Sequence, residues 1–236
     1  MVKVDFERMT TISQPLADHS LDPPVRGLLH SPPSPAGAGL VLTHGAGGDC
    51  RAPVLVAVAE ACAAGGVTVL RCDLPFRQTR PSGPPRPAEA ARDRAGLAQA
   101  VSVLARLVGG PVCLGGHSYG GRQATMLAAE QPGLVQSLLV LSYPLHPLRR
   151  STELRTGHFT QLRTPAMFVH GSRDPFGSLE QLREALRLIS GPTVLMAVDG
   201  AGHELLGHGR VSATDRVDEI ARRFVAFVAT GGSGPK

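Results

Sequence analysis

Short apolar runs of strand length alternate along this chain with longer segments of helical periodicity. The runs expected to form strands span residues 25–30, 39–44, 67–72, 112–116, 137–142, 166–171 and 193–198. The segments expected to form helices span residues 52–64, 87–108, 119–130, 178–189 and 212–229. Strands and helices that alternate in this way build a parallel sheet covered by helices. The pattern therefore predicts an α/β fold with a mostly parallel central sheet flanked by helices.

The length of 236 residues suits one large α/β domain with a well-filled core, or two small domains. The alternation of strands and helices continues almost to the end of the chain without an internal repeat. We therefore expect a single domain over residues 1–230. The sequence GGSGPK closes the chain, and we expect residues 231–236 to form a flexible tail.

Composition argues against several classes of protein. The apolar runs are too short to cross a membrane, and the first residues mix charges and hydroxyl groups where a secretory signal would be apolar, which predicts a cytoplasmic protein. The net charge of +5 comes from arginines scattered among carboxylates, so we expect a solvated surface and no nucleic-acid partner. The four cysteines lack paired spacing and are expected to be buried, reduced thiols.

The segment GGHSYGG, residues 115–121, joins an expected strand to an expected helix. Gly116, Ser118 and Gly120 fit the G-x-S-x-G pattern, in which a serine sits on a sharp, strained turn and glycines make room for the closely passing backbone. The Tyr119 amide would then lie at a helix N-terminus, where it can stabilise an oxyanion. A tight turn with a capping serine is the alternative, and a phosphate loop is disfavoured because no Gly-Lys-Ser/Thr follows.

A second glycine-rich loop, THGAGGD at residues 43–49, directly follows another expected strand. Its glycines keep the loop free of side chains, and we assign the second oxyanion donor to the Ala46 amide. A dinucleotide-binding fingerprint would need a third glycine at the position of Cys50, so that alternative is disfavoured.

An acid and a histidine complete the pattern. Asp174 follows the strand at 166–171, and His203 follows the strand at 193–198, so the order Ser118, Asp174, His203 is that of a nucleophile, its acid and its base. Asp174 could also be a turn residue before Pro175. A zinc motif of the H-E-x-x-H type places its two histidines about four residues apart, on one face of a helix. His203 and His208 are five residues apart, so they do not fit this motif. We expect no metal and no cofactor.

With these motifs in order, the chain resembles the α/β-hydrolase superfamily, and within it the small, lid-free relatives of dienelactone hydrolase. It is most similar to the group that includes the hydrolase-like domain of the NSL chromatin-complex subunit and its bacterial relatives. The residues that carry the resemblance are THGAGGD, RCDLPF, GGHSYGGR, LSYPLHP, LRTGHF and GSRDPFG. The resemblance implies an α/β-hydrolase fold without a lid domain, with Ser118 as nucleophile, His203 as base, Asp174 as its orienting acid, and the Ala46 and Tyr119 amides as the oxyanion hole.

The sequence therefore predicts a serine hydrolase that acts on a small-molecule carboxylic ester, or on a thioester or lactone. The alternatives are a peptidase or acyltransferase with the same triad and a non-catalytic interaction module on this fold. Residues 146–163 carry the most one-sided charge cluster of the chain, which is expected either to be a solvated loop or to bind an acidic substrate. Arg155 and His158 from this segment, together with Phe176, are the candidate substrate-binding residues. The sequence does not indicate the oligomeric state.

Overall fold

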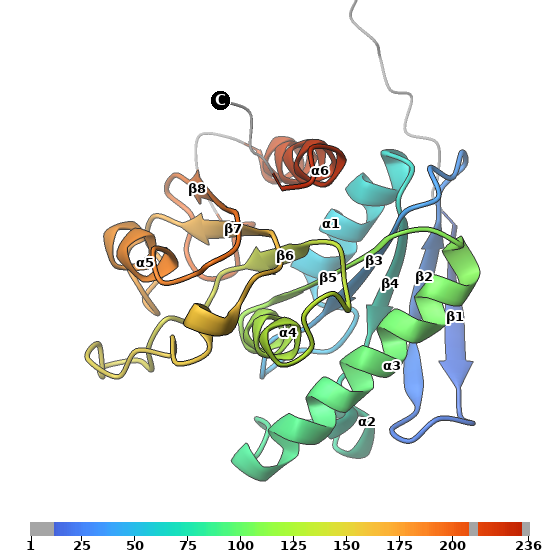
Figure 1. The fold of residues 1–236 in the computed structure, drawn as a ribbon, viewed down its shortest axis with the longest axis horizontal. Coiled ribbons are helices and arrows are strands. Elements are labelled where there is room, and N and C mark those ends of the chain that lie inside the picture. The colour runs from blue at the N-terminus through green and yellow to red at the C-terminus, as the bar shows by residue number, and fades with distance from the viewer. Residues whose placement is uncertain (1–11, 208–211, 233–236) are drawn as a thin grey trace, which may run out of the picture.

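The computed structural model describes residues 12–207 and 212–232, through which one eight-stranded sheet runs (Figure 1). The strand order across the sheet is β1-β2-β4-β3-β5-β6-β7-β8. The first two strands pair antiparallel, β2 also pairs antiparallel with β4, and every later pair is parallel. The strands are β1 (Ile12–Asp18), β2 (Val25–Ser31), β3 (Gly39–Thr43), β4 (Thr68–Cys72), β5 (Val112–His117), β6 (Leu138–Leu141), β7 (Ala166–Gly171) and β8 (Thr193–Val198).

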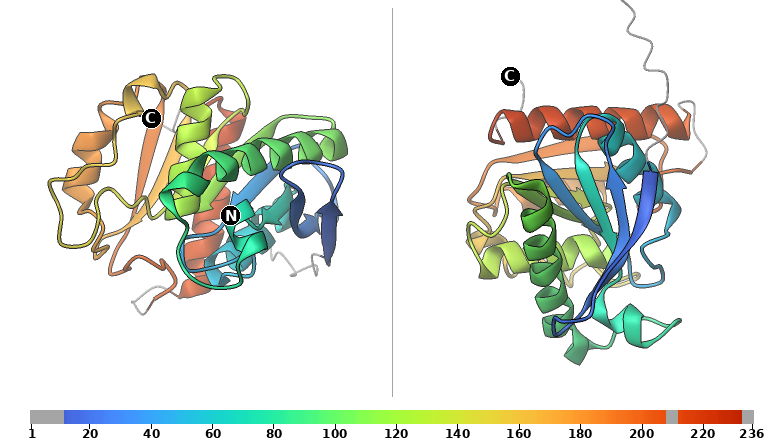
Figure 2. Two further views of the ribbon diagram at one scale, coloured as in Figure 1. Left: turned by 90° about the horizontal axis from the view of Figure 1, so that it is seen from below. Right: turned by 90° about the vertical axis from the view of Figure 1, so that its right-hand side faces the viewer.

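Helices cover both faces of the sheet (Figure 2). One face packs against α1 and α6, and the other packs against α3, α4 and α5. The α-helices are α1 (Pro53–Ala64), α2 (Pro75–Thr79), α3 (Ala90–Val108), α4 (Tyr119–Glu130), α5 (Leu179–Leu186) and α6 (Ala213–Ala229). Two short 3-10 helices are η1 (Pro87–Glu89), which leads into α3, and η2 (Phe159–Gln161).

The central strands are apolar without interruption because both of their faces are covered. All residues of β3, β5, β6 and β7 are buried. In β7, Phe168 packs into the cluster beneath α3, α4 and α5, whereas Met167 and Val169 pack into the cluster beneath α1 and α6. This is the pattern of parallel strands between two helical layers, and it explains why short apolar runs marked the strands in the sequence.

The predicted α/β architecture, a mostly parallel central sheet flanked by helices, is confirmed, and each predicted strand and helix is present. The sequence analysis missed β1 and α2. In β1, polar residues and a proline interrupt the apolar pattern, and the described side chains are mostly exposed, so its strand conformation comes from pairing with β2. Helix α2 spans only 5 residues, too few for helical periodicity to appear in the sequence.

The last two residues that the structure describes close the end of α6. Gly231 adopts a φ of 64°, and the Gly232 amide donates a hydrogen bond of 2.9 Å to the Phe227 carbonyl. These features form a glycine C-cap, so the first two residues of the predicted tail close the helix. The rest of that tail, residues 233–236, lies outside the described residues.

The connection between β6 and β7 is short, as expected for a lid-free hydrolase. Within residues 142–165 the structure forms only η2, and the segment loops out beside α4 (Figure 1). The four cysteines are free and buried, as predicted. None of the helices in the described ranges is long and apolar enough to cross a membrane.

Histidine His30 links β2 to β4 inside the sheet. Its side chain is 1% exposed, and its Nε2 accepts a hydrogen bond of 2.7 Å from Nε of Arg71. Burial, with a smaller contribution from the Arg71 charge, lowers the pKa of His30 to about 4. The neutral ring is therefore the form that fits the folded protein.

We expect this buried histidine to make the protein less stable as the pH falls from 7 to 5. In that range the unfolded chain binds a proton at His30 and the folded chain does not, so the free energy of unfolding falls by about 1–2 kcal/mol from this group. Urea unfolding at both pH values measures the effect. His30→Gln keeps an acceptor without titrating and should reduce the loss of stability between pH 7 and 5 by this amount, while other buried histidines maintain the rest. An unchanged dependence would contradict the assignment.

Candidate active site

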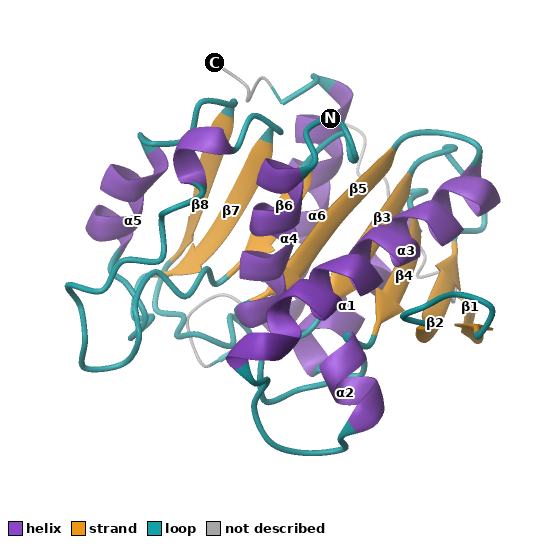
Figure 3. Ribbon diagram, turned by 60° about the horizontal axis from the view of Figure 1, so that its bottom comes forward, coloured by secondary structure: helices purple, strands orange, loops and turns teal. Residues whose placement is uncertain are grey.

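The parallel strands point their carboxyl ends toward one edge of the sheet, where α2 and several long loops lie (Figure 3). Open α/β sheets bind ligands at this edge. The loops that follow β3, β5, β7 and β8 carry Ala46, Ser118, Asp174 and His203 respectively. The predicted triad residues therefore all leave the sheet on the same side.

Ser118 occupies a strained turn between β5 and α4, with φ 51° and ψ −114°. Two glycines permit the close approach of the backbone at this turn. A methyl group at Gly116 would lie 2.7 Å from the Gly120 carbonyl carbon, and one at Gly120 would lie 2.5 Å from the His44 carbonyl oxygen. Both separations are too short for a side chain, so the glycine pattern in the sequence reflects a real steric demand.

Ser118, His203 and Asp174 form a continuous chain of hydrogen bonds. The Ser118 Oγ lies 2.8 Å from His203 Nε2, and His203 Nδ1 lies 2.8 Å from Asp174 Oδ2. An ionised carboxylate only accepts, so Nδ1 carries the proton and Nε2 presents a lone pair to the serine hydroxyl. This is the arrangement in which a histidine can withdraw the proton of a serine.

The loop that carries Asp174 is fixed at both of its ends. The second carboxylate oxygen, Oδ1, accepts a hydrogen bond of 2.9 Å from the Phe176 amide. His170 at the end of β7 is fully buried and donates a hydrogen bond of 2.8 Å from Nε2 to the Gly177 carbonyl. These contacts hold the acid so that Oδ2 faces His203.

The imidazole of His203 contacts two other rings. The centroid of the Phe176 ring is 4.4 Å away and that of His117 is 5.0 Å away. His117 Nε2 donates a hydrogen bond of 2.9 Å to the His203 carbonyl, and burial lowers the pKa of His117, which favours its neutral form. Sequence analysis did not single out His117, which here holds the backbone of the candidate base.

The Ala46 and Tyr119 amides have no acceptor among the residues that the structure describes. Tyr119 begins α4, where backbone amides are free and the helix dipole favours negative charge. The loop with Ala46 passes the serine closely, because a methyl group at Gly45 would lie 3.4 Å from Ser118 Cβ. Both amides are thus available for an oxyanion next to the serine.

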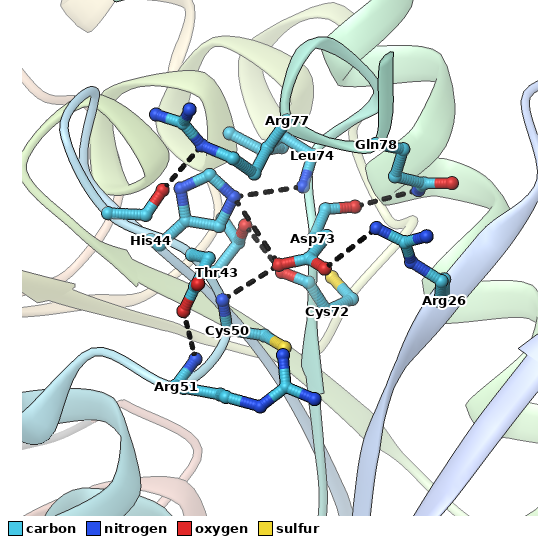
Figure 4. A network of polar contacts seen from close by, with 12 residues as sticks. Arg26, Thr43, His44, Cys50, Arg51, Cys72, Asp73, Leu74, Arg77 and Gln78 are labelled. Atoms are coloured by element: carbon cyan, nitrogen blue, oxygen red, sulfur yellow. Dashed lines mark hydrogen bonds and ion pairs between the residues drawn. The ribbon is translucent and has the colours of Figure 1, made fainter. Parts of the chain in front are cut away.

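A network of buried polar groups holds the loop that carries Ala46 (Figure 4). His44 Nδ1 donates a hydrogen bond of 2.8 Å to the Gly45 carbonyl, and its Nε2 accepts one of 3.1 Å from the Leu74 amide. Burial lowers the pKa of His44, which suits a ring that donates at one nitrogen and accepts at the other. At the far end of the loop, Asp73 accepts a hydrogen bond of 2.8 Å from the Cys50 amide.

Arg77 binds the same loop from α2. Its Nε donates 2.8 Å to the Gly48 carbonyl, and a terminal nitrogen donates 2.9 Å to the Ala46 carbonyl. The residue is only 6% exposed. Sequence analysis missed it, although it closely follows the quoted segment RCDLPF at the carboxyl end of β4.

The predicted substrate-binding residues lie in two places. Phe176 contacts His203, whereas Arg155 and His158 line a cavity of about 540 Å³ between α4 and the segment after β6. None of the triad residues lines this cavity. Arg122, in the first turn of α4, lines it as well and was not singled out from the sequence.

A family model described as an alpha/beta hydrolase domain matches residues 36–229. This range runs from just before β3 to the end of α6, and it includes the turn at Ser118 and the loops with Asp174 and His203. The chain belongs to the α/β-hydrolase family.

Solved structures of several α/β-hydrolases share this fold. Dienelactone hydrolase from Anabaena variabilis is 20% identical with a TM-score of 0.71, and the match covers 92% of this chain and 98% of that one. A serine hydrolase without a lid from Xanthomonas campestris is 17% identical with a TM-score of 0.68, covering 92% and 96%. Est1E from Butyrivibrio proteoclasticus is 16% identical with a TM-score of 0.70, covering 93% and 100%. The predicted resemblance to small, lid-free hydrolases is confirmed at the level of the fold.

We expect Gly120→Ala to destabilise this α/β-hydrolase because the new methyl group would overlap the His44 carbonyl. The free energy of unfolding should fall by about 2 kcal/mol or more, as for an overpacked core. Gly157→Ala is the control, since nothing lies within 4 Å of a methyl group there. Denaturant unfolding compares the two variants, and equal losses would contradict the steric argument.

Proposed function

We propose that this α/β-hydrolase cleaves carboxylic esters of small molecules with Ser118 as nucleophile. The observation that carries the proposal is the hydrogen-bonded chain from Ser118 through His203 to Asp174, with both distances at 2.8 Å. The strained φ of 51° at Ser118 supports it, because such strain concentrates at functional positions. The relatives that are named as hydrolases add support for this class of reaction.

In the first half of the proposed cycle, the Ser118 hydroxyl attacks the ester carbonyl while His203 Nε2 takes its proton. Asp174 stabilises the resulting imidazolium through Nδ1. The Ala46 and Tyr119 amides receive the negative charge that develops on the carbonyl oxygen. His203 then donates its proton to the departing alcohol, and the acyl group remains on Ser118.

In the second half, water replaces the alcohol. His203 withdraws a proton from this water, which attacks the acyl-enzyme, and the same two amides stabilise the second oxyanion. His203 returns the proton to Ser118 as the acid product leaves. These steps need no cofactor, and they apply equally to thioesters and lactones because the attacked carbon is the same.

We expect Ser118→Ala to abolish hydrolysis of activated aryl esters, with a loss on the order of 10⁶ in turnover. His203→Ala should be nearly as damaging, and the double variant scarcely worse, because members of a triad act as a unit. Steady-state kinetics with an aryl ester panel measures this, and circular dichroism checks that each variant is folded.

His208→Ala is the control for the choice of base, and it should retain near wild-type activity. A larger loss of turnover in His208→Ala than in His203→Ala would refute the assignment of His203 as the base.

A fluorophosphonate probe separates an enzyme from a non-catalytic module, because a non-catalytic module would not be labelled at Ser118. An amide panel and an acyl-acceptor panel would identify a peptidase or an acyltransferase.

We also expect Arg77→Met to lower kcat while KM changes little. The loss of two hydrogen bonds to the loop would move the Ala46 amide, and the removal of one oxyanion donor costs on the order of 10²–10³ in turnover. A donor that is displaced but still present should lower kcat by about tenfold or more. Arg80→Met is the matched control, because Arg80 pairs with Glu89 and does not contact the loop. A parallel rise in KM, or equal losses in both variants, would argue against a positioning role for Arg77.

A further inference from the structure

The cavity beside α4 is separate from the triad and carries its own chemistry. One wall is the exposed side of α4, and the other is the segment between β6 and β7, which includes η2. The apolar part of the lining consists of Met126, Ala129, Pro147 and Leu154. It is an open groove with a volume of about 540 Å³, because several lining residues, among them Glu153 and Leu154, are exposed.

The acidic residues that line the cavity already have basic partners. Glu130 pairs with Arg94 at 2.8 Å, and Glu153 pairs with Arg150 at 3.0 Å. Neither Arg94 nor Arg150 lines the cavity. The negative charges of the lining are therefore largely balanced by residues at its edge.

The two arginines of the lining have no such partner. Neither Arg122 nor Arg155 forms an ion pair with a carboxylate within residues 12–207 and 212–232. The Nε of Arg122 is buried and has no hydrogen-bond partner in these ranges. The nearest acceptor of Arg155 is the Pro144 carbonyl, at a long 3.4 Å from Nη1. The buried Nε–H of Arg122 without an acceptor is costly, and a bound anion would remove that cost.

The charges of the cavity also favour the binding of an anion. Burial, followed by the charge of Arg122, lowers the pKa of Arg155, so the two guanidinium groups repel each other across a partly desolvated space. Burial and the charges of Arg122 and Arg94 lower the pKa of His158 to about 4. His158 is therefore neutral at pH 7, and it contacts Thr125 Oγ1 at 2.9 Å. The positive charge of the cavity comes from the two arginines.

The cavity begins close to the candidate nucleophile. Arg122 lies one helical turn after Ser118, and its amide donates a hydrogen bond of 3.0 Å to the Ser118 carbonyl. A helical turn rises about 5.4 Å, which is the reach of a few methylene groups. The backbones of these two residues are thus separated by about the length of a short acyl chain.

We propose that this cavity binds a carboxylate that the ester substrate carries at a distance from its scissile bond. The inference rests on the proposed ester hydrolysis at Ser118 and names the class of substrate: a monoester of a dicarboxylic acid, or a similar ester with one remote acid group. The apolar lining would contact the connecting chain. The planar guanidinium groups of Arg122 and Arg155 would bind the carboxylate oxygens.

A single negative charge suits this site better than a phosphate. The carboxylates of Glu130 and Glu153 remain in the lining although they are paired, and they would repel a dianion more strongly than a monoanion. A carboxylate also offers two oxygens in one plane, which matches the fork of each guanidinium.

The kinetic test compares aryl esters of neutral acyl chains with monoaryl esters of dicarboxylic acids of matched, increasing length. In the wild type, kcat/KM should favour the anionic series by about tenfold or more at low salt, and high salt should reduce this preference. Arg155→Met and Arg122→Met should lose most of the preference for the anionic series, with a larger fall in kcat/KM on the anionic esters than on the neutral ones. Arg155→Lys should retain part of it.

The matched control is Arg163→Met. Arg163 belongs to the same charged segment, is exposed and does not line the cavity, so this variant should keep the full preference. Equal losses on both ester series in Arg155→Met, or no preference in the wild type, would overturn the proposal.

A binding experiment separates this inference from the proposed function. Calorimetric titration of Ser118→Ala with the favoured monoester should give binding that weakens about tenfold or more when Arg155→Met is added. If the wild type hydrolyses no ester but this Arg155-dependent binding persists, the proposed function fails and the carboxylate site stands. If the monoester does not bind, or inorganic phosphate displaces it with equal potency, the carboxylate site is overturned.

Discussion

The close contact between β5 and α4 is the constraint on which the rest of the site depends. The backbone of β5 passes so near the start of α4 that Gly116 could not carry a side chain, and the end of β3 with His44 passes so near α4 that Gly120 could not carry one either. Ser118, which lies between these two glycines, adopts a φ of 51°, which costs on the order of 1–3 kcal/mol for a residue other than glycine. The buried strands on either side of β5 supply the stability that maintains this strain, so the serine is held in one orientation before any substrate arrives.

The order of strands then explains how residues far apart in the sequence meet at this serine. β5 lies between β3 and β6, and β7 and β8 lie beyond β6. Since these strands are parallel, the loop with Ala46 approaches Ser118 from one side and the loops with Asp174 and His203 approach it from the other. The order and direction of the strands therefore bring these loops together. Each loop needs only a few residues beyond its strand to place its amide or side chain near Ser118.

The sequence was sufficient for every strand except β1 and for every α-helix except α2, because these depend on local patterns. The same kind of pattern gave the predicted order of Ser118, Asp174 and His203. Runs of apolar residues mark the buried strands, and glycines mark the turn around Ser118. Arg77 could not be found in this way, since its acceptors are backbone carbonyls 29 and 31 residues away. For Arg155 the charge of its segment was a useful signal, but it did not reveal that the residue would line a cavity beside α4. Such contacts arise only when the segment after β6 folds against that helix.

Arg77 and Arg155 show why charge in a sequence does not by itself identify a ligand site. The guanidinium of Arg77 donates to the carbonyls of Ala46, Gly48, Arg80 and Gly83, so its donors are used inside the protein. Arg155 has only one long hydrogen bond, and the buried Nε of Arg122 has none among the described residues. An arginine whose donors are satisfied stabilises the fold, whereas a partly buried arginine with free donors favours an incoming anion. By this criterion Arg77 supports the loop beside the serine, and the cavity beside α4 is the place where we propose that an anionic group of the substrate binds.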